Sequence, residues 1–538
     1  MKNKQELKLL EEVGSWAVTK TLEDLKKYSK GELALSDEST RLINNEFRLL
    51  RKNFVKSLLK SEKIAEKALN EKNHDERRVA HFNEVMNKYK NAVLDYYPPA
   101  ANAWVLDGLV FSNQLAGLKK LAGFANGDGH VIDVLNSASS VALGAENPWL
   151  VKIDRAENHM GIKDNMCTAY HPGLRHGFAL TELAKLHPNK KLSGLTVHSE
   201  SSGTVVDSIA IESVVSYSEK NLNHSRMRRV MAVDGTWAGG YGSAREGTGF
   251  GIDGQQRKKS GKNLWVDRCL PPPVKEYSGE FMKILENKVK NNEAAGLYLE
   301  PDIVGDLGIV DVDDGLLKKA AGLLKKNGLP IIADCVQQLG RTGGYWGENV
   351  ESILKDYPLL VLTTAKSSSN GQPFGFTVMP RQIAHSAHAL SQITTNQMNG
   401  PLLRALAVSK MLTNKKFQAW LKKKAETIEK VASRYGFKPG YKGLRGKHLN
   451  RGIYMGDNNL VKLAQIALLI EDGILIGAVP EALRYQPMLL ELSSTNEKVA
   501  NAIFRRVKKV MNGEVSPAVK KTYEKMERVA TGLARKNT

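Results

Sequence analysis

Cysteine is scarce in this sequence, with only Cys167, Cys269 and Cys335 among 538 residues. The three lie far apart and form no Cys-x-x-Cys pair, which argues against a disulfide framework and a cysteine-based zinc site. No apolar run approaches the roughly 20 residues that span a bilayer, and the first residues lack the apolar stretch of a signal peptide. We therefore expect a soluble protein of the reducing cytoplasm, without a membrane partner.

Acidic residues are also in short supply, because 57 Asp and Glu face 78 Lys and Arg and leave a net charge of +21. Such a charge attracts nucleic acid, anionic membrane or acidic metabolites alike. The chain shows no helix-turn-helix, zinc finger or basic motif interleaved with aromatic residues, so nucleic-acid binding is the weaker alternative. His171 and His176 are more typical of polar surface or capping groups than of ligands, and we predict no metal site.

Proline is absent from residues 1–95, which contain two glycines and many Lys, Glu and Leu residues. The spacing of Ile43, Phe47, Leu50, Phe54 and Leu58 predicts a helix. We interpret residues 1–95 as a helical N-terminal extension, which ends where consecutive prolines at 98 and 99 break the pattern.

From about residue 190 short apolar segments alternate with helical stretches and glycine-rich turns, which predicts an α/β fold with a doubly wound, mainly parallel sheet. Beyond about residue 405 two amphipathic helices, a strand-and-turn region and a basic helical tail indicate a smaller α+β domain. The strands that we predict are Leu195–His198, Val230–Val233, Gly296–Leu299, Pro330–Ala333 and Leu359–Leu362.

Two of these strands end close to side chains of opposite charge. Asp334 follows one strand and Lys366 follows the next, and ligands of open α/β sheets bind at the carboxyl ends of strands. Alone, each has an ordinary explanation, a capping carboxylate and a solvated cation. Together they supply what pyridoxal phosphate requires, an amine for its aldehyde and an anion for its ring nitrogen.

A phosphate site is the remaining requirement of that cofactor. Ser201-Ser202-Gly203-Thr204 lies between a predicted strand and a helix over about residues 205–217. Backbone N–H groups and hydroxyls at a helix N-terminus bind anions. Taken alone, such a turn is usually only a helix cap.

The order of these segments resembles that of the class III pyridoxal-phosphate aminotransferases, of the ornithine and 4-aminobutyrate aminotransferase type and fold type I. The resemblance covers roughly residues 96–512. Its motifs are Gly127–Asp133 with Gly144–Pro148, Ser201–Thr204, Glu300-Pro301, Asp334–Gln337 with Gly340–Gly343, Lys366, Gln372–Gly375, Thr394-Thr395 with Gly400–Leu402, and Arg484–Pro487.

The resemblance implies a role for each matching position around the cofactor. Lys366 would form the Schiff base and move the proton, and Asp334 would keep the ring nitrogen protonated. The remaining cofactor-binding residues would be Ser202, Gly203 and Thr204 at the phosphate, Gln337 at the ring hydroxyl, Trp237 stacked on the ring, and Thr395 at the phosphate of the partner subunit. A shift of one residue would replace Trp237 with Thr236 at the stacking position.

Substrate would be held by Arg484, whose planar fork suits a carboxylate, and Glu300 could pair with Arg484 when the substrate ends in an amine. The resemblance implies a homodimer with shared active sites. It also implies a large cofactor-binding domain over residues 151–405 with a seven-stranded type of sheet, and a small domain built from residues 96–150 and 406–538.

The function expected from these features is transfer of an amino group between an amino acid or amine and a 2-oxo acid. Departures from the family pattern, such as Cys335 in place of a glutamate and Ser367–Asn370 after the lysine, leave racemase, aminomutase or decarboxylase chemistry on the same cofactor as an alternative.

Overall fold

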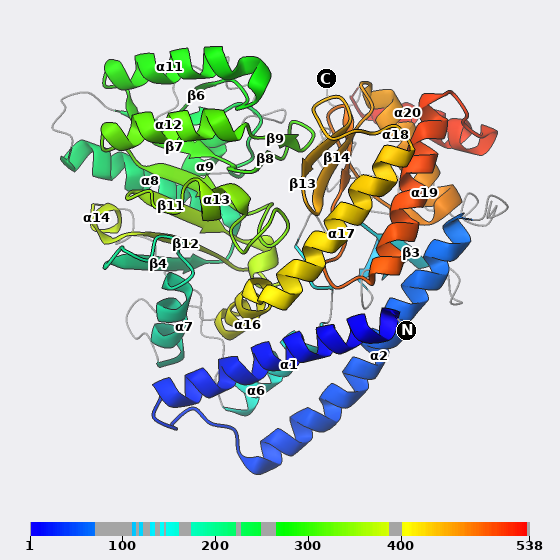
Figure 1. Cartoon of the computed structure of the whole chain (residues 1–538), viewed down its shortest axis with the longest axis horizontal. Coiled ribbons are helices and arrows are strands. Elements are labelled where there is room, and N and C mark those ends of the chain that lie inside the picture. The colour runs from blue at the N-terminus through cyan, green and yellow to red at the C-terminus, as the bar shows by residue number, and fades with distance from the viewer. Residues whose placement is uncertain are drawn as a thin grey trace. The chain divides into compact units, whose positions relative to one another are not determined.

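The computed structural model describes residues 2–69, 110–113, 118–121, 130–134, 140–144, 147–160, 174–221, 228–240, 242–248, 265–386 and 401–534 (Figure 1). Contacts within the chain divide it into two compact units. The first comprises Met1–Lys8, Leu50–Asn147 and Trp420–Thr538, and the second comprises Leu9–Leu49 and Pro148–Ala419. Among the described helices, none is both long enough and apolar enough to cross a bilayer.

The second unit is built on a seven-stranded sheet. Its order is β4 (Leu195–Glu200), β12 (Gly375–Pro380), β11 (Leu360–Thr364), β10 (Ile331–Asp334), β7 (Ala294–Leu299), β5 (Arg229–Val233) and β6 (Val266–Leu270). All strands run parallel except β12, which is antiparallel to both neighbours. The predicted mainly parallel sheet is thus confirmed, and β6 and β12 are strands that the sequence pattern did not identify.

Burial explains why the central strands are apolar on both faces. Every residue of β7, β10, β11 and β12 is buried, as expected of parallel strands covered by helices on both sides. Helix α8 (Gly203–Asn221) packs against several of these strands and is itself buried around most of its circumference. Helix α12 (Asp314–Lys326) is amphipathic, and Asp313 caps its first turn by accepting a 2.6 Å hydrogen bond from the Leu316 amide.

Several shorter elements complete the second unit. They are α6 (Pro148–His159), α7 (Leu174–Ala184), α9 (Gly242–Gly247), η3 (Lys275–Tyr277), α11 (Ser278–Lys290), β8 (Ile303–Val304), β9 (Val310–Asp311), α13 (Glu348–Ser352), η4 (Lys366–Ser368), α14 (Arg381–Ala384) and α16 (Leu402–Thr413).

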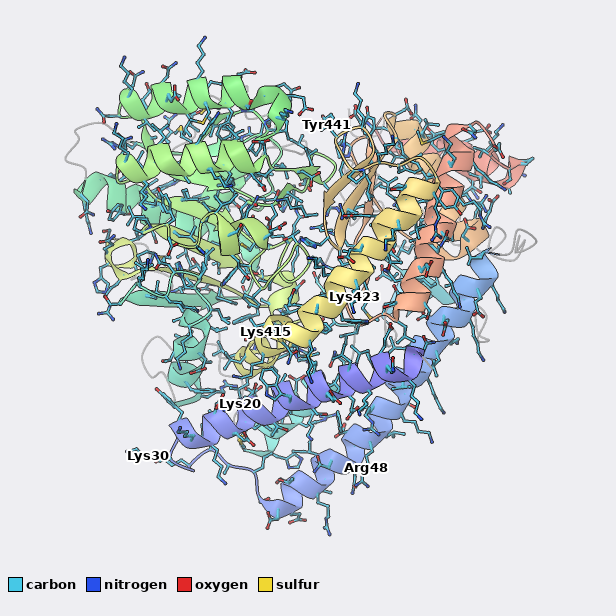
Figure 2. All side chains as sticks on the ribbon, viewed as in Figure 1. Lys20, Lys30, Arg48, Lys415, Lys423 and Tyr441 are labelled. Atoms are coloured by element: carbon cyan, nitrogen blue, oxygen red, sulfur yellow. The ribbon has the colours of Figure 1, made fainter. Side chains whose placement is uncertain are left out.

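The N-terminal extension forms two long helices, α1 (Lys2–Tyr28) and α2 (Asp37–Leu69). The helical spacing in α2 corresponds to its buried stripe, since Ile43, Phe54 and Leu58 are buried. Residues 70–95 of the predicted extension lie outside the described part of the chain. Arg48 on α2, Lys20 on α1 and Lys423 on α17 (Lys415–Arg434) are exposed (Figure 2).

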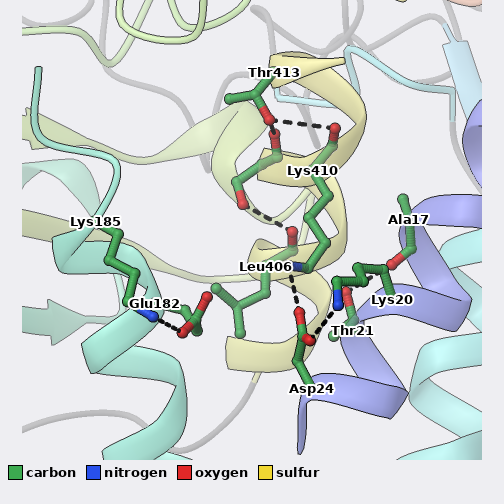
Figure 3. Close-up of polar contacts among 10 residues, drawn as sticks. Ala17, Lys20, Thr21, Asp24, Glu182, Lys185, Leu406, Lys410 and Thr413 are labelled. Atoms are coloured by element: carbon green, nitrogen blue, oxygen red, sulfur yellow. Dashed lines mark hydrogen bonds and ion pairs between the residues drawn. The ribbon is translucent and has the colours of Figure 1, made fainter.

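Helix α1 is anchored in the second unit by a close approach and by an ion pair. Gly14 faces the ring of Trp149 on α6, where an added Cβ would lie 2.3 Å from Cδ2 of the indole. Near the end of α1, Asp24 accepts a 3.1 Å hydrogen bond from Lys410 on α16 and pairs with Lys20 at 2.7 Å (Figure 3). Burial would raise the pKa of Asp24, but the two lysines outweigh it and lower that pKa overall.

The first unit is an α+β structure that draws strands from distant parts of the chain. One sheet has the order β1 (Val110–Asn113), β2 (Leu118–Leu121), β3 (His130–Asp133) and β15 (Ile474–Leu475), with β15 parallel to β3. The other is antiparallel, with the order β13 (Leu444–Lys447), β14 (Asn450–Tyr454), β17 (Ala482–Tyr485) and β16 (Gly477–Val479). Its helical elements include α18 (Asn458–Ala467), η5 (Leu468–Asp472), α19 (Ser493–Met511) and α20 (Pro517–Ala534).

Candidate active site

The predicted acid and lysine lie at the same edge of the large sheet. Strands β10 and β11 pair in parallel with Asp334 opposite Thr363, so both strands end at this edge. Lys366 is the second residue after β11, is half-buried, and has a left-handed backbone with a φ of 46°. The positive charge of Lys366 lowers the pKa of Asp334.

The carboxylate of Asp334 is buried and held through both oxygens. Its Oδ1 accepts a 2.8 Å hydrogen bond from the Val336 amide, and its Oδ2 accepts a 2.6 Å hydrogen bond from the Tyr298 hydroxyl. Burial raises the pKa of Asp334 to about 6, while these hydrogen bonds and Lys366 act in the opposite direction. The two hydrogen bonds and the lysine favour the anionic form of Asp334, which is the form that a protonated ring nitrogen requires in its partner.

The predicted phosphate turn lies beside both of these residues. Strand β4 ends at Glu200 and α8 begins at Gly203, so the first amides of a 19-residue helix are not used within it. A Cβ added to Gly203 would lie 3.4 Å from the side chains of Val336 and Ala365. Because these residues adjoin Asp334 and Lys366, the helix N-terminus, the acid and the lysine converge on one region.

Thr204 is confined by a second glycine. A Cβ on Gly239, whose φ is 151°, would lie 2.5 Å from Oγ1 of Thr204. The close approach requires glycine at this position, because any larger side chain would displace the threonine. Ser202 and Thr204 are both half-buried, one directly before α8 and the other in its first turn.

Glu300 and Gln337 meet at one tight turn. Glu300 follows β7, is 1% exposed, and accepts a 2.7 Å hydrogen bond from the Gly305 amide through Oε2. A Cβ on Gly305 would lie 2.7 Å from Oε1 of the buried Gln337. Both residues thus lie at the same carboxyl edge as Asp334, because β7 is the other neighbour of β10.

The two candidates for the stacking ring differ in burial. Thr236 is fully buried, and its hydroxyl donates to the carbonyl oxygens of Val233 at 2.8 Å and Gly247 at 3.2 Å. Trp237 is 42% exposed and follows β5 at the same edge of the sheet. The Thr236 hydroxyl is thus engaged with backbone carbonyl groups. This favours Trp237 as the side chain available to a ligand.

Two predicted residues are not part of the described second unit. Thr395 falls outside the described residues. Arg484 lies in the first unit, on β17 between β14 and β16, and is 8% exposed. The pairing of Arg484 with Glu300 therefore stays a prediction.

The Gly340-Arg341-Thr342-Gly343 motif supports the loop that follows Asp334. The Thr342 hydroxyl donates a 2.6 Å hydrogen bond to Asp302, which also accepts from the Asn349 amide at 2.8 Å. The Asp302 amide in turn donates to Oε1 of Gln338 at 3.1 Å. These buried contacts tie the loop after β10 to the loop after β7 and so hold Asp334 and Gln337 in place.

Three residues that the sequence reasoning missed surround this region. Tyr298 lies on β7, and Asp207 lies on α8 as a fully buried carboxyl. Arg404 on α16 donates to the carbonyl oxygens of Ser369 and Asn370, just after Lys366. A carboxylate within the apolar part of α8 was a detectable signal, whereas nothing local marks Tyr298 or Arg404.

Within the described part of the chain, no group of three or more His, Cys, Asp and Glu side chains could hold a metal ion. His176 is buried on α7, and His171 lies outside the described ranges.

Comparisons with known proteins bear on the identity of this site. The family described as aminotransferase class-III matches residues 124–507. The chain is 29% identical over 250 residues to an alanine–glyoxylate aminotransferase 2 homolog of Arabidopsis thaliana, covering 40% of this chain and 50% of the relative. It is 31% identical over 202 residues to the acetylornithine aminotransferase of Streptomyces coelicolor, covering 37% and 48%. The chain thus spans about half of the length of these curated relatives.

Solved structures show the same fold. An aminotransferase of Vibrio fluvialis in its PMP-bound form superposes with a TM-score of 0.64 at 15% identity, covering 76% of this chain and 94% of the other. The ornithine aminotransferase of Toxoplasma gondii superposes with a TM-score of 0.64 at 17% identity, covering 80% and 96%. The predicted fold type I architecture is confirmed by this likeness and by the sheet order.

Proposed function

The chain belongs to the class III aminotransferase family, and from this premise we propose that it is a pyridoxal-phosphate-dependent aminotransferase. It would move an amino group between an amino acid or amine and a 2-oxo acid. The observation that carries the proposal is the convergence of Lys366, Asp334 and the N-terminus of α8 at one edge of the sheet.

The residues at this edge fit the cofactor. Asp334 supplies a buried anion for the ring nitrogen, and Lys366 supplies a primary amine for the aldehyde. The first amides of α8, with Ser202 and Thr204, supply donors for the phosphate. Gln337 would donate to the ring hydroxyl oxygen, and Trp237 would cover the ring. When bound, pyridoxal phosphate withdraws electrons from the carbon that carries the amino group, which makes its hydrogen acidic.

The chain's own groups would then manage the proton and the substrate. Lys366 would supply the amine base that carries the proton away from the reacting carbon and back. Asp334 would keep the ring nitrogen positively charged. Arg484 would hold the carboxylate of the amino acid or oxo acid.

Borohydride trapping tests the proposal. Full-length protein mixed with pyridoxal phosphate should absorb visible light, and borohydride should fix the cofactor on the peptide that contains Lys366. The Lys366→Ala variant should lose this adduct and nearly all turnover. The matched control Lys326→Ala, which removes an exposed lysine at the end of α12, should retain both. An identical adduct in Lys366→Ala protein would show that another lysine carries the cofactor.

Omitting the acceptor distinguishes transamination from the other chemistries of this cofactor. An aminotransferase should consume its amino donor catalytically only when a 2-oxo acid is present. Continued turnover without a 2-oxo acid would instead indicate a racemase, aminomutase or decarboxylase.

We also propose that the protein is a cytoplasmic homodimer. The family resemblance supports shared active sites, with Thr395 at the phosphate of the partner subunit. The free thiols of Cys269 and Cys335 are consistent with a reducing compartment. Light scattering of the purified chain and imaging of a fluorescent fusion test the two statements, and a monomeric mass or an organellar signal would contradict them.

A further inference from the structure

The tyrosine beneath the predicted ring-nitrogen site is placed by sheet register. Strand β7 pairs with β10 in parallel, with Tyr298 opposite Ile332. Asp334 is two residues further along β10, so its side chain points to the same face of the sheet as Ile332 and Tyr298. Two residues of a strand span about 6.6 Å, which a tyrosine side chain can reach. The result is the 2.6 Å hydrogen bond from the Tyr298 hydroxyl to Oδ2 of Asp334.

Burial keeps Tyr298 a hydrogen-bond donor. Its side chain is fully buried, and its pKa is raised well above 10 by that burial and by the negative charges of Asp207 and Asp334. Burial and the charge of Asp334 likewise raise the pKa of Asp207 well above its ordinary value. Each of these two buried carboxyls therefore disfavours the ionisation of the other.

The titratable groups that act on Asp334 come from four segments of the second unit. Tyr298 lies on β7 and Asp207 lies on α8, and Glu300, directly after β7, acts on both of them. Asp306 lies in the turn between β8 and β9, and Lys366 follows β11. Cys335, adjacent in sequence, is neutral because burial raises its pKa. Of these groups, the structure gives Tyr298 a direct hydrogen bond to the carboxylate.

We propose that Tyr298 is a positioning residue that holds Asp334 in the orientation and charge state required by the ring nitrogen of the cofactor. The hydroxyl donates to Oδ2 while the Val336 amide donates to Oδ1, and these two hydrogen bonds favour one orientation of the carboxylate. A hydrogen bond to the charged form stabilises the carboxylate, so the proton stays on the ring nitrogen. The inference rests on the proposed function.

The test measures the affinity of the full-length apoprotein for pyridoxal phosphate between pH 5 and pH 8. In the wild type the affinity should fall as Asp334 becomes protonated. Tyr298→Phe keeps the buried ring but removes the donor, so the pKa of Asp334 should rise. The pH at which affinity falls should then move upward by about one unit. A purely structural defect would weaken binding by the same factor at every pH.

Two controls isolate the hydrogen bond. Tyr345→Phe removes another buried hydroxyl, for which no hydrogen-bond partner is seen among the described atoms, and should leave the midpoint unchanged. In an Asp334→Asn background, Tyr298→Phe should no longer move the pH dependence, because the group that titrates is gone. Coincident midpoints for wild type and Tyr298→Phe, or an equal shift in Tyr345→Phe, would overturn the inference.

A second substitution covers the case in which Tyr298→Phe does not fold. Site-specific Tyr298→3-fluorotyrosine keeps the ring and the hydroxyl but makes the phenol a stronger donor, so the midpoint should move downward. An unchanged or raised midpoint would count against the inference. Failure of the wild-type protein to bind pyridoxal phosphate at any pH would refute the proposed function and this inference with it. Normal binding without a response at position 298 would refute the inference alone.

Discussion

The guanidinium of Arg404 donates a 2.8 Å hydrogen bond from Nε to the carbonyl oxygen of Ser369, three residues after Lys366. It also pairs with Asp154 at 2.5 Å, and its side chain is 6% exposed. One buried cation on α16 therefore ties the loop that carries the lysine to α6. The loop needs such an anchor because Lys366 and Asn370 both have left-handed backbones.

Removing this cation should loosen the lysine loop. We expect Arg404→Met to lower the free energy of unfolding by about 2 to 4 kcal/mol, because buried carbonyl groups and Asp154 lose a charged partner. Arg404→Lys keeps the positive charge but lacks the planar guanidinium, so it should lower the free energy of unfolding by less than Arg404→Met. The control Arg381→Met changes an exposed arginine at the start of α14 and should shift stability by under about 0.5 kcal/mol. Chemical denaturation followed by circular dichroism measures all three, and equal midpoints for Arg404→Met and wild type would contradict the assigned role.

The raised pKa of Asp334 predicts that the free energy of unfolding of the apoprotein depends on pH. Because burial raises this pKa from 3.8 to about 6, the folded state holds its proton where the unfolded state has lost it. Stability due to this group should therefore fall as pH rises from about 4 to about 6, and stay constant above that range.

Comparing wild type with Asp334→Asn isolates the effect, because all other titrating groups are shared. The stability of the wild type relative to the variant should decline across this interval. Urea midpoints at closely spaced pH values measure it, and a difference that is flat or increases between pH 4 and pH 6 would show that the carboxyl is not desolvated.

Replacing glycine with alanine at two positions should change the stability of the protein in opposite directions. In the interior of a helix this substitution gains up to about 1 kcal/mol. At Gly322 on α12 an added Cβ meets no atom within 4 Å, so Gly322→Ala should stabilise the protein. At Gly14 the Cβ would lie 2.3 Å from the Trp149 ring, and overpacking of about 1 to 3 kcal/mol should outweigh the gain. Thermal unfolding tests the pair, and stabilisation by Gly14→Ala would show that α1 does not pack closely on α6.

Arg484 is the predicted carboxylate clamp. We expect Arg484→Ala to raise KM for carboxylate-bearing substrates by about 10- to 150-fold, which corresponds to a lost charge-assisted interaction of about 1.5 to 3 kcal/mol. Arg484→Lys should recover only part of the loss, since it lacks the planar fork. Arg434→Ala, at an exposed position of α17, is the matched control. Steady-state kinetics measures KM for each variant. A KM unaffected by Arg484→Ala would mean that another cation binds the carboxylate.

Local patterns predicted much of the central sheet. Five of its strands were located from short apolar runs, because a parallel strand covered on both faces must be apolar throughout. The pattern failed at β6, whose central residues Asp267 and Arg268 interrupt the apolar run. It also could not show that β12 runs against its neighbours, since direction leaves no trace in composition.

The sequence predicted that Asp334 and Lys366 follow strands and that Ser202–Thr204 precedes a helix. It could do so because the boundaries of strands and helices depend on local sequence. Which side chains support them was decided only by the tertiary structure. Tyr298 reaches Asp334 because β7 lies beside β10 in a particular register, and Arg404 reaches Ser369 because α16 packs beneath a loop 35 residues earlier. Such contacts depend on which strands and helices pack together over long sequence distances. No local sequence pattern around Tyr298 or Arg404 predicts them.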